Sequence, residues 1–285
     1  MISWRQSVFG LCFLDLHQLH QSLAAPAQSL GLERSLSLVH PQFHIHLFEN
    51  LSSTNAKLWE LLKADAPAGS VVIAQQQSAG RGQWGRTWES PLGGLYLSLA
   101  LVPNLSVHQA HCLTQYSAWG IAAALRTLGI PVQIKWPNDL VVQSRKLGGI
   151  LTETRIEAGL ITQAVIGVGL NVTNPVPTIG INLATVLADF PVAALERLET
   201  VAALVLRGIV QGYQFHQKVD TVTFRKTYES LLINFGQTVN IDGHSGRVIG
   251  VSEQGSLRVR LAPTQHSDGD EIDMPPGAIA LGYNT

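Results

Sequence analysis

"GRGQWGRTWESPLGGLYLSL", residues 80–99, joins a glycine- and arginine-rich loop to an apolar run of strand-forming residues. Its first six letters match G-x-G-x-x-G, a pattern found in dinucleotide-binding turns. Such a turn follows a strand directly, opens a helix, and precedes a ribose-binding acid by about 20 residues. Here residues 75–79 separate the loop from the apolar run 71–74, Pro91 opposes a helix, and no acid lies within 99–104. The context therefore excludes an NAD-dependent oxidoreductase.

The composition of this loop favours a different ligand. Glycines let backbone N–H groups approach an anion closely, and Arg81 and Arg86 add donors matched to phosphate or carboxylate. Trp84 and Trp88 are large enough to cover an apolar ligand. The glycines also raise the entropy cost of ordering residues 79–86, so we expect a ligand to order them. The segment is thus either an anion-binding loop or a flexible surface hairpin.

Length and charge limit the classes of protein that need to be considered. The chain has 285 residues, is 46% hydrophobic and carries a formal net charge of −1. This length suits one large domain and one small one. The near-zero charge gives no global attraction to nucleic acid or to acidic membranes. Two cysteines, Cys12 and Cys112, are too few for a disulfide framework, so we expect a reducing, cytoplasmic setting.

Two segments look at first like targeting or membrane sequences. Asp15 interrupts the N-terminal apolar run, and a single arginine precedes it, which opposes a signal peptide. Residues 158–188 carry no charge, but Pro175 and Pro177 lie within them, and their apolar runs are far shorter than the roughly 20 residues of a membrane span. We therefore expect no membrane insertion.

Periodicity predicts an α+β region followed by a small all-β region. Helical spacing of apolar residues predicts helices after Ser53, over 108–128, and from 189–191 to about 214. Short apolar or alternating runs predict strands at 43–51, 70–74, 95–102, 132–136, 140–143, 148–153 and 164–172. Glycine-bounded strands then follow at 237–243, 246–255, 256–262, 271–277 and 278–283. Short strands in this number and spacing predict a small antiparallel barrel.

Four motifs together resemble those of one family. Residues 80–99 are followed by KWPNDL (135–140), RKLGGILTET (145–154) and VIGVGLNV (165–172), and in this order they resemble the motifs of biotin protein ligases. The resemblance covers residues 45–285. It implies an α+β fold, with a class II synthetase-like biotin/lipoate ligase catalytic domain of mixed sheet and flanking helices, and a small C-terminal SH3-like barrel. The expected boundaries are an N-terminal extension at 1–42, the catalytic domain at 43–232 and the barrel at 233–285.

The resemblance implies a reaction in two steps. The biotin carboxylate attacks the α-phosphate of ATP to give biotinyl-5'-AMP and pyrophosphate, and a lysine of the biotin carboxyl carrier protein of acetyl-CoA carboxylase then displaces AMP. Bringing two anions together requires cations at the α-phosphate and Mg²⁺ on the polyphosphate. We expect the ATP phosphates to hold this ion, because the sequence contains no convincing cluster of metal-binding side chains.

The same resemblance assigns roles to individual residues. Lys146 corresponds to the lysine beside the α-phosphate and the biotin carboxylate, and Asp139 is expected to orient the incoming amine. Ser53 and Thr54 are suited to the biotin ureido group, to helix capping, or to both. The expected catalytic residues are Lys146, Asp139 and Arg81; the biotin-binding residues are Ser53, Thr54, Asn55, Gln77, Arg81, Gly82, Gln83, Lys146 and Gly149; and the ATP- or adenylate-binding residues are Arg81, Arg86, Trp88, Asn138, Lys146 and Asn171.

One position departs from the family pattern. The family loop often reads G-R-G-R, but here Gln83 replaces the second arginine. A backbone contact survives this change, whereas a charge contact does not. The replacement therefore puts tight retention of the adenylate by this position in doubt.

Two related functions compete with a biotin ligase that lacks a DNA-binding module. A bifunctional ligase–repressor needs a basic N-terminal module, but Arg5 and Arg34 are the only Lys or Arg residues before residue 45. We therefore expect no DNA partner. A lipoate or octanoate ligase would share the catalytic architecture, and labelled biotin and lipoate would distinguish the two. The sequence leaves open whether the protein is a monomer or a homodimer.

Overall fold

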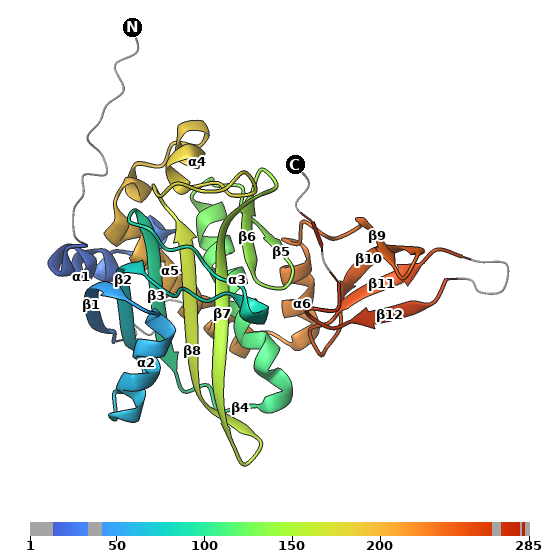
Figure 1. Cartoon of the computed structure of the whole chain (residues 1–285), viewed down its shortest axis with the longest axis horizontal. Coiled ribbons are helices and arrows are strands. Elements are labelled where there is room, and N and C mark those ends of the chain that lie inside the picture. The colour runs from blue at the N-terminus through green and yellow to red at the C-terminus, as the bar shows by residue number, and fades with distance from the viewer. Residues whose placement is uncertain (1–13, 34–41, 264–268, 280, 283–285) are drawn as a thin grey trace, which may run out of the picture.

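The main structural unit is an eight-stranded mixed sheet. The computed structural model describes residues 14–33, 42–263, 269–279 and 281–282 (Figure 1). The strand order is β1-β2-β3-β8-β7-β6-β5, with β4 pairing the far end of β8. Only β1 and β2 are parallel. The strands are β1 His44–Leu51, β2 Ser70–Gln77, β3 Gly94–Leu101, β4 Leu105–Ser106, β5 Gln133–Lys135, β6 Asp139–Val142, β7 Arg145–Glu157 and β8 Leu160–Asn171.

The longest pair in this sheet is the β7–β8 hairpin. Its strands have 13 and 12 residues and are joined by Ala158 and Gly159, whose φ angles are 49° and 79°. Two consecutive positive φ angles are typical of the turn that matches strand twist in a tight hairpin. The hairpin gives the centre of the sheet a long paired platform, with one shift of register between Arg155 and Ile156.

Helices cover both faces of the sheet, because its central strands are apolar on both sides. Leu58 and Leu62 of α2 (Thr54–Lys63) pack against Val72, Ala100 and Val165 on one face. The opposite face packs against α3 (Ala110–Thr127) and α5 (Leu198–Lys218). This burial on both sides follows from the near-continuous apolar runs of β2 and β3.

Helices α3 and α5 approach each other closely at glycines. A Cβ atom added at Gly120 would lie 2.0 Å from the Gly208 carbonyl oxygen, and one at Gly212 would lie 2.0 Å from that of Tyr116. Any larger side chain at either position would therefore force the two helices apart. The close approach places both helices under the sheet, on the face opposite α2.

The described part of the N-terminal region packs onto α5. Helix α1 (Leu16–Ala24) is followed by a 3₁₀ turn, Ala27–Leu30, and Leu19 and Leu30 are fully buried. The guanidinium of Arg207, on α5, donates to the Leu23 and Ala25 carbonyl oxygens. These residues therefore share the main core, whereas residues 1–13 and 34–41 of the expected extension lie outside the described residues.

One predicted helix boundary is wrong. The sequence indicates a helix that begins at residues 189–191, but Asp189 ends a separate short helix, α4 (Leu183–Asp189). Asn182 caps α4, because its side chain accepts a hydrogen bond from Thr185 N at 2.9 Å. Pro191 follows, and α5 begins only at Leu198.

A second, smaller sheet follows α6 (Thr221–Glu229) and lies to one side of the main sheet (Figure 1). It is antiparallel, in the order β12-β11-β10-β9, with bounds β9 Thr238–Ile241, β10 His244–Val251, β11 Leu257–Leu261 and β12 Glu271–Met274. Four of the predicted strands are thus confirmed. Residues 278–279 and 281–282 are not in a strand, and residues 280 and 283 of the fifth predicted strand lie outside the described residues.

The small sheet is attached to the main one through both apolar and polar contacts. Val248, Leu257 and Val259 belong to the main core. The Trp136 indole donates to the Gly255 carbonyl oxygen at 3.0 Å, and Glu229 accepts from Val251 N at 2.8 Å.

Within the described part of the chain, no helix is long and apolar enough to cross a bilayer.

Candidate functional site

A cavity of about 370 Å³ lies above the centre of the main sheet, on the face covered by α2. Its floor comes from Gly149, Gly167 and Gly169 of the β7–β8 hairpin, and the glycine-rich loop forms one wall. Every predicted site residue except Asn171 lines this cavity: Ser53, Thr54, Asn55, Gln77, Arg81, Gly82, Gln83, Arg86, Trp88, Asn138, Asp139, Lys146 and Gly149.

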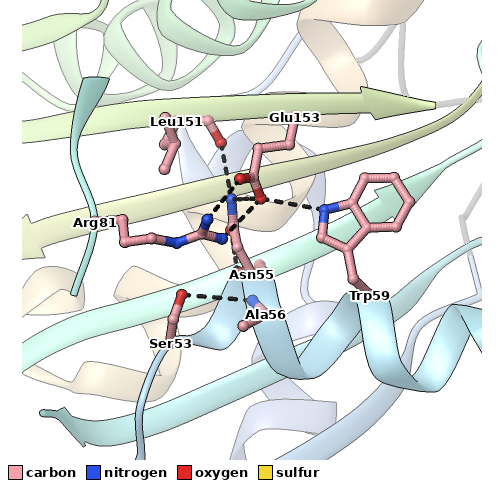
Figure 2. Close-up of polar contacts among 8 residues, drawn as sticks. Ser53, Asn55, Ala56, Trp59, Arg81, Leu151 and Glu153 are labelled. Atoms are coloured by element: carbon pink, nitrogen blue, oxygen red, sulfur yellow. Dashed lines mark hydrogen bonds and ion pairs between the residues drawn. The ribbon is translucent and has the colours of Figure 1, made fainter. Parts of the chain in front are cut away.

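One end of the cavity is a buried polar cluster at the start of α2. Ser53 caps this helix, its side chain accepting from Ala56 N at 3.4 Å (Figure 2). Gln77 Oε1 accepts hydrogen bonds from Thr54 N and Oγ1 at 2.8 and 3.2 Å. Capping therefore accounts for Ser53 independently of any ligand, while Thr54 and Gln77 orient each other at the cavity wall.

Asn55 is held in the same cluster by Ser98, whose hydroxyl donates to Asn55 Oδ1 at 2.6 Å. A Cβ atom added at Gly167 would lie 2.2 Å from that oxygen. The glycine in β8 therefore leaves space for the Asn55 amide. The sequence reasoning missed Ser98, although its place among the buried positions of β3 made it the one polar residue in an apolar run.

The other end of the cavity carries charge. Lys146 Nζ, on β7, lies 2.7 Å from Asp139 Oδ1, on β6. The same ammonium lies 5.2 Å from the centre of the Trp88 ring, a distance suited to a cation–π contact. A Cβ atom at Gly149 would lie 3.3 Å from Asp139 Oδ1 and 3.6 Å from Lys146 Nζ. Two of the three predicted catalytic side chains thus meet directly over a residue without a side chain.

Trp88 also contributes a donor. Its indole Nε1 is buried, and it has no hydrogen-bond partner among the described residues. A Cβ atom at Gly169 would lie 2.4 Å from this nitrogen, so glycine is needed for the ring to approach β8 this closely. A buried donor without a partner is costly. At a cavity wall, a ligand acceptor would remove that cost.

Lys135 is a cavity residue to which sequence reasoning gave no role, although it opens the KWPNDL motif. Burial lowers the pKa of Lys135; Asp139 acts against this shift, whereas Lys146 and Arg86 add to it. Four cationic side chains, Arg81, Arg86, Lys135 and Lys146, therefore line a cavity to which Asp139 brings the single carboxylate among the described lining residues. This balance favours an anionic ligand.

The glycine-rich loop is closed by backbone hydrogen bonds. Gly82 N donates to the Arg86 carbonyl oxygen at 2.7 Å, and Trp88 N donates to that of Gly80 at 2.9 Å. Trp84, at the tip, is 59% exposed and lies against Gly277, which with Ile279 and Leu281 brings the C-terminal segment to the cavity rim. No sequence signal indicated this contribution.

Two asparagines support the site through the backbone. Asn138 Nδ2 donates to the Ile150 carbonyl oxygen at 2.8 Å, which ties the start of β6 to β7. Asn171 Nδ2 donates to the Lys146 carbonyl oxygen at 3.3 Å, and its Oδ1 accepts from Asn174. Asn171 is thus the one predicted residue that the structure keeps out of the cavity.

Among the residues that the structure describes, no group of three or more His, Cys, Asp or Glu side chains is arranged to hold a metal ion.

The cleft, with its cationic wall above the mixed sheet, defines an α+β protein with an anion-binding site, and comparison with known proteins identifies the family. Residues 47–171 match the family model described as the biotin/lipoate A/B protein ligase family. The chain is 30% identical over 243 residues to the bifunctional ligase/repressor BirA of Escherichia coli K12, covering 83% of this chain and 75% of that protein. It is 35% identical over 237 residues to biotin–protein ligase 2 of Arabidopsis thaliana, covering 76% and 70%. The chain belongs to the biotin/lipoate A/B protein ligase family.

Solved structures show the same fold. The biotin protein ligase of Aquifex aeolicus in complex with biotin and ATP matches 81% of this chain and 99% of its own, with a TM-score of 0.60 and 22% sequence identity. The biotin protein ligase of Leishmania major in complex with biotinyl-5-AMP matches with a TM-score of 0.54, 21% identity and coverage of 82% and 99%. The mixed α+β fold with its second, small antiparallel sheet is therefore shared with this group.

Proposed function

We propose that this protein activates biotin with ATP and transfers it to a lysine of a biotin carboxyl carrier protein. The observation that carries the proposal is the Lys146–Asp139 pair, 2.7 Å apart, in the same cavity as the polar cluster around Thr54, Asn55 and Gln77. A molecule with a polar ring edge at one end and a carboxylate at the other fits this arrangement. The Arabidopsis relative, named a biotin–protein ligase, supports biotin as that molecule.

In the first step, a carboxylate oxygen of biotin bonds to the α-phosphorus of ATP, and the bond to pyrophosphate breaks. Negative charge gathers on the α-phosphate oxygens as this happens, and preorganised cations stabilise it. Lys146 and Lys135 approach from the β5–β7 side of the cavity and Arg81 and Arg86 from the loop. Mg²⁺ on the ATP phosphates would neutralise the leaving pyrophosphate, and the phosphates rather than protein side chains would hold it.

We assign recognition of the biotin rings to the end of the cavity formed by the polar cluster at the start of α2. The ureido group presents donors and an acceptor that must all be paired, since each unpaired buried group costs about 1–3 kcal/mol. The hydroxyls and amides of Ser53, Thr54, Asn55 and Gln77 supply both kinds of partner. The Trp88 indole N–H, which lacks a partner among the described residues, lies near Lys146 at the charged end and would donate to the adenylate instead.

In the second step, the amine of the acceptor lysine bonds to the carbonyl carbon of the adenylate, AMP leaves, and the amine loses a proton. Asp139 is the carboxylate of this cavity, with a side chain 12% exposed. It would orient the amine and receive its proton, while Lys146 stays with the phosphate. We infer that the acceptor is the carrier protein of acetyl-CoA carboxylase and that the reaction takes place in the cytoplasm, where the free thiol of Cys112 would stay reduced.

The C-terminal residues belong to this proposal as well. We infer that β9–β12 form most of an SH3-like barrel over 233–285, next to a catalytic domain at 43–232 and an N-terminal extension at 1–42. The small antiparallel sheet buries Val248, Leu257 and Val259 on one face, as a barrel strand would, which supports this view. The contact between Trp84 and Gly277 would let this region help close the cavity.

Calorimetric titration and acceptor labelling test this function. The protein should bind biotin and leave lipoate unbound, and with ATP and Mg²⁺ it should transfer labelled biotin to a purified carrier domain. A carrier whose acceptor lysine is replaced by arginine is the control and should remain unlabelled. Preferential binding of lipoate would instead assign the chain to the lipoate branch of the family.

A further inference from the structure

Glu153, on β7, is a carboxylate on which three side chains from two separate segments converge (Figure 2). The Arg81 guanidinium contacts both of its oxygens, with Nη1 3.0 Å from Oε1 and Nη2 3.1 Å from Oε2. From α2, Asn55 Nδ2 and Trp59 Nε1 donate to Oε2 at 2.9 and 3.1 Å. One side chain on the sheet therefore joins the glycine-rich loop to α2.

Glu153 lies next to the proposed substrate cavity but does not line it. The described residues that line the cavity of about 370 Å³ include Arg81 and Asn55 but not Glu153. Glu153 instead lines a neighbouring cavity of about 800 Å³ between the loop and α3. Towards the cavity of about 370 Å³ it acts through Arg81 and Asn55, which both contact its Oε2 atom and were both expected to bind biotin.

Physical chemistry makes this carboxylate an effective anchor. Two parallel contacts between a guanidinium and a carboxylate fix direction as well as distance. Glu153 lies on a long strand, directly opposite Val165 of β8, so its backbone is fixed by the sheet. Arg81 lies instead between Gly80 and Gly82, where glycine makes ordering costly. The carboxylate is therefore the more firmly held of the two partners.

We propose that Glu153 is a positioning residue: it holds the Arg81 guanidinium and the Asn55 amide in place before substrate enters, and so restrains the glycine-rich loop over the cavity. The consequence for catalysis rests on the proposed function; the restraint of the loop does not. A structural role confined to attaching α2 through Trp59 is the competing explanation.

Hydrogen exchange in the ligand-free protein separates these explanations. Glu153→Gln keeps the size of the side chain but loses its charge, and it should speed exchange of residues 80–88 by about tenfold or more, since hydrogen bonds to a charged group contribute about 1.5–3 kcal/mol. Trp59→Phe should leave that exchange unchanged. Glu60→Gln is the matched control, because Glu60 pairs with Lys57 on the exposed side of α2. Faster exchange in 54–63 with no change in 80–88 would overturn the proposal.

A double-mutant cycle tests the catalytic consequence, with kcat/KM for biotin in ATP–pyrophosphate exchange as the readout. Glu153→Gln should lower this value roughly tenfold in the wild-type background and less than about twofold when Arg81 is already alanine. Effects that multiply would show that Glu153 does not act through Arg81. Absence of biotin-dependent ATP–pyrophosphate exchange in the wild-type protein would instead overturn the proposed function. Hydrogen exchange of residues 80–88 would still decide the role of Glu153.

Discussion

Lys146 lies between a carboxylate and an aromatic ring, 2.7 Å from Asp139 Oδ1 and 5.2 Å from the centre of the Trp88 ring. These contacts hold an ammonium group at one end of the cavity while leaving it 25% exposed. A cation fixed before the reaction requires little reorganisation when negative charge develops on a phosphate. Much of the proposed chemistry therefore depends on this one side chain.

Lys146→Ala should lower the rate of biotin adenylation by roughly 10²–10³, because it removes a preorganised cation from the developing charge. Single-turnover formation of the adenylate measures the effect, and thermal unfolding should change little. Lys57→Ala, on the outer side of α2, is the matched control and should react as the wild type does. A Lys146→Ala rate within twofold of wild type would remove this lysine from the mechanism.

Lys135 gives the site a dependence on pH. Burial lowers its pKa below the ordinary lysine range, so its positive charge is lost at a lower pH than that of an exposed lysine. We predict that kcat/KM for adenylation falls on the alkaline side as Lys135 loses its proton, since this parameter reports the free enzyme. Lys135→Arg keeps the charge and should move the fall to higher pH, whereas Lys57→Arg should not. Identical profiles for wild type and Lys135→Arg would contradict the assignment.

Local motifs predicted the cavity residues well and their partners poorly. Lys146 and Asp139 were predictable because each lies within a short motif with its own chemistry. The contacts of Glu153 were not, since they join residues 72, 94 and 98 positions apart. Asn171 shows the opposite error, because a motif residue acts on the Lys146 backbone rather than at the cavity.

At the scale of elements, the sheet was the most predictable part of the molecule. Each expected strand of the main sheet was found, since buried apolar runs and alternation are local properties of the sequence. The start of α5 was missed, because Asp189 was interpreted as the beginning of a helix when it ends one that Asn182 caps. The pairing of α3 with α5 was also missed, since it depends on glycines in two distant helices.

Gly120→Ala tests that helix pairing. In an ordinary helix interior this change stabilises by roughly 0.5–1 kcal/mol. Here the new Cβ would lie 2.0 Å from the Gly208 carbonyl oxygen, so we expect a loss of about 1–3 kcal/mol from overpacking. Denaturant unfolding measures the change. A gain in stability would show that α3 and α5 are farther apart than described.

At the scale of the whole molecule, the contacts made by the two terminal regions of the chain could not be predicted from the sequence. Residues 14–33 join the main core through distant contacts with α5, such as the one from Arg207 to Leu23, 184 positions away. Gly277 similarly reaches Trp84 from the far end of the chain. Neither contact leaves a local sequence pattern, so both regions were predicted only as separate segments.

The related ligase/repressors make DNA binding the main alternative activity to test. Residues 14–33 contain no lysine or arginine, and DNA affinity depends strongly on phosphate neutralisation by such residues. We predict weak, salt-sensitive association with DNA in a mobility-shift titration, with or without biotin and ATP. Saturable, sequence-specific binding strengthened by both ligands would instead make this chain a ligase with a regulatory function.

Biotin-dependent exchange of pyrophosphate into ATP tests the central claim most directly, because adenylate formation needs no acceptor protein. With Mg²⁺ and labelled pyrophosphate, the protein should produce labelled ATP when biotin is present and none when biotin is omitted or replaced by lipoate. The Lys146→Ala variant should lose most of this exchange, which would tie the activity to the cavity. Exchange that proceeds equally with lipoate, or that fails with biotin, would contradict the account.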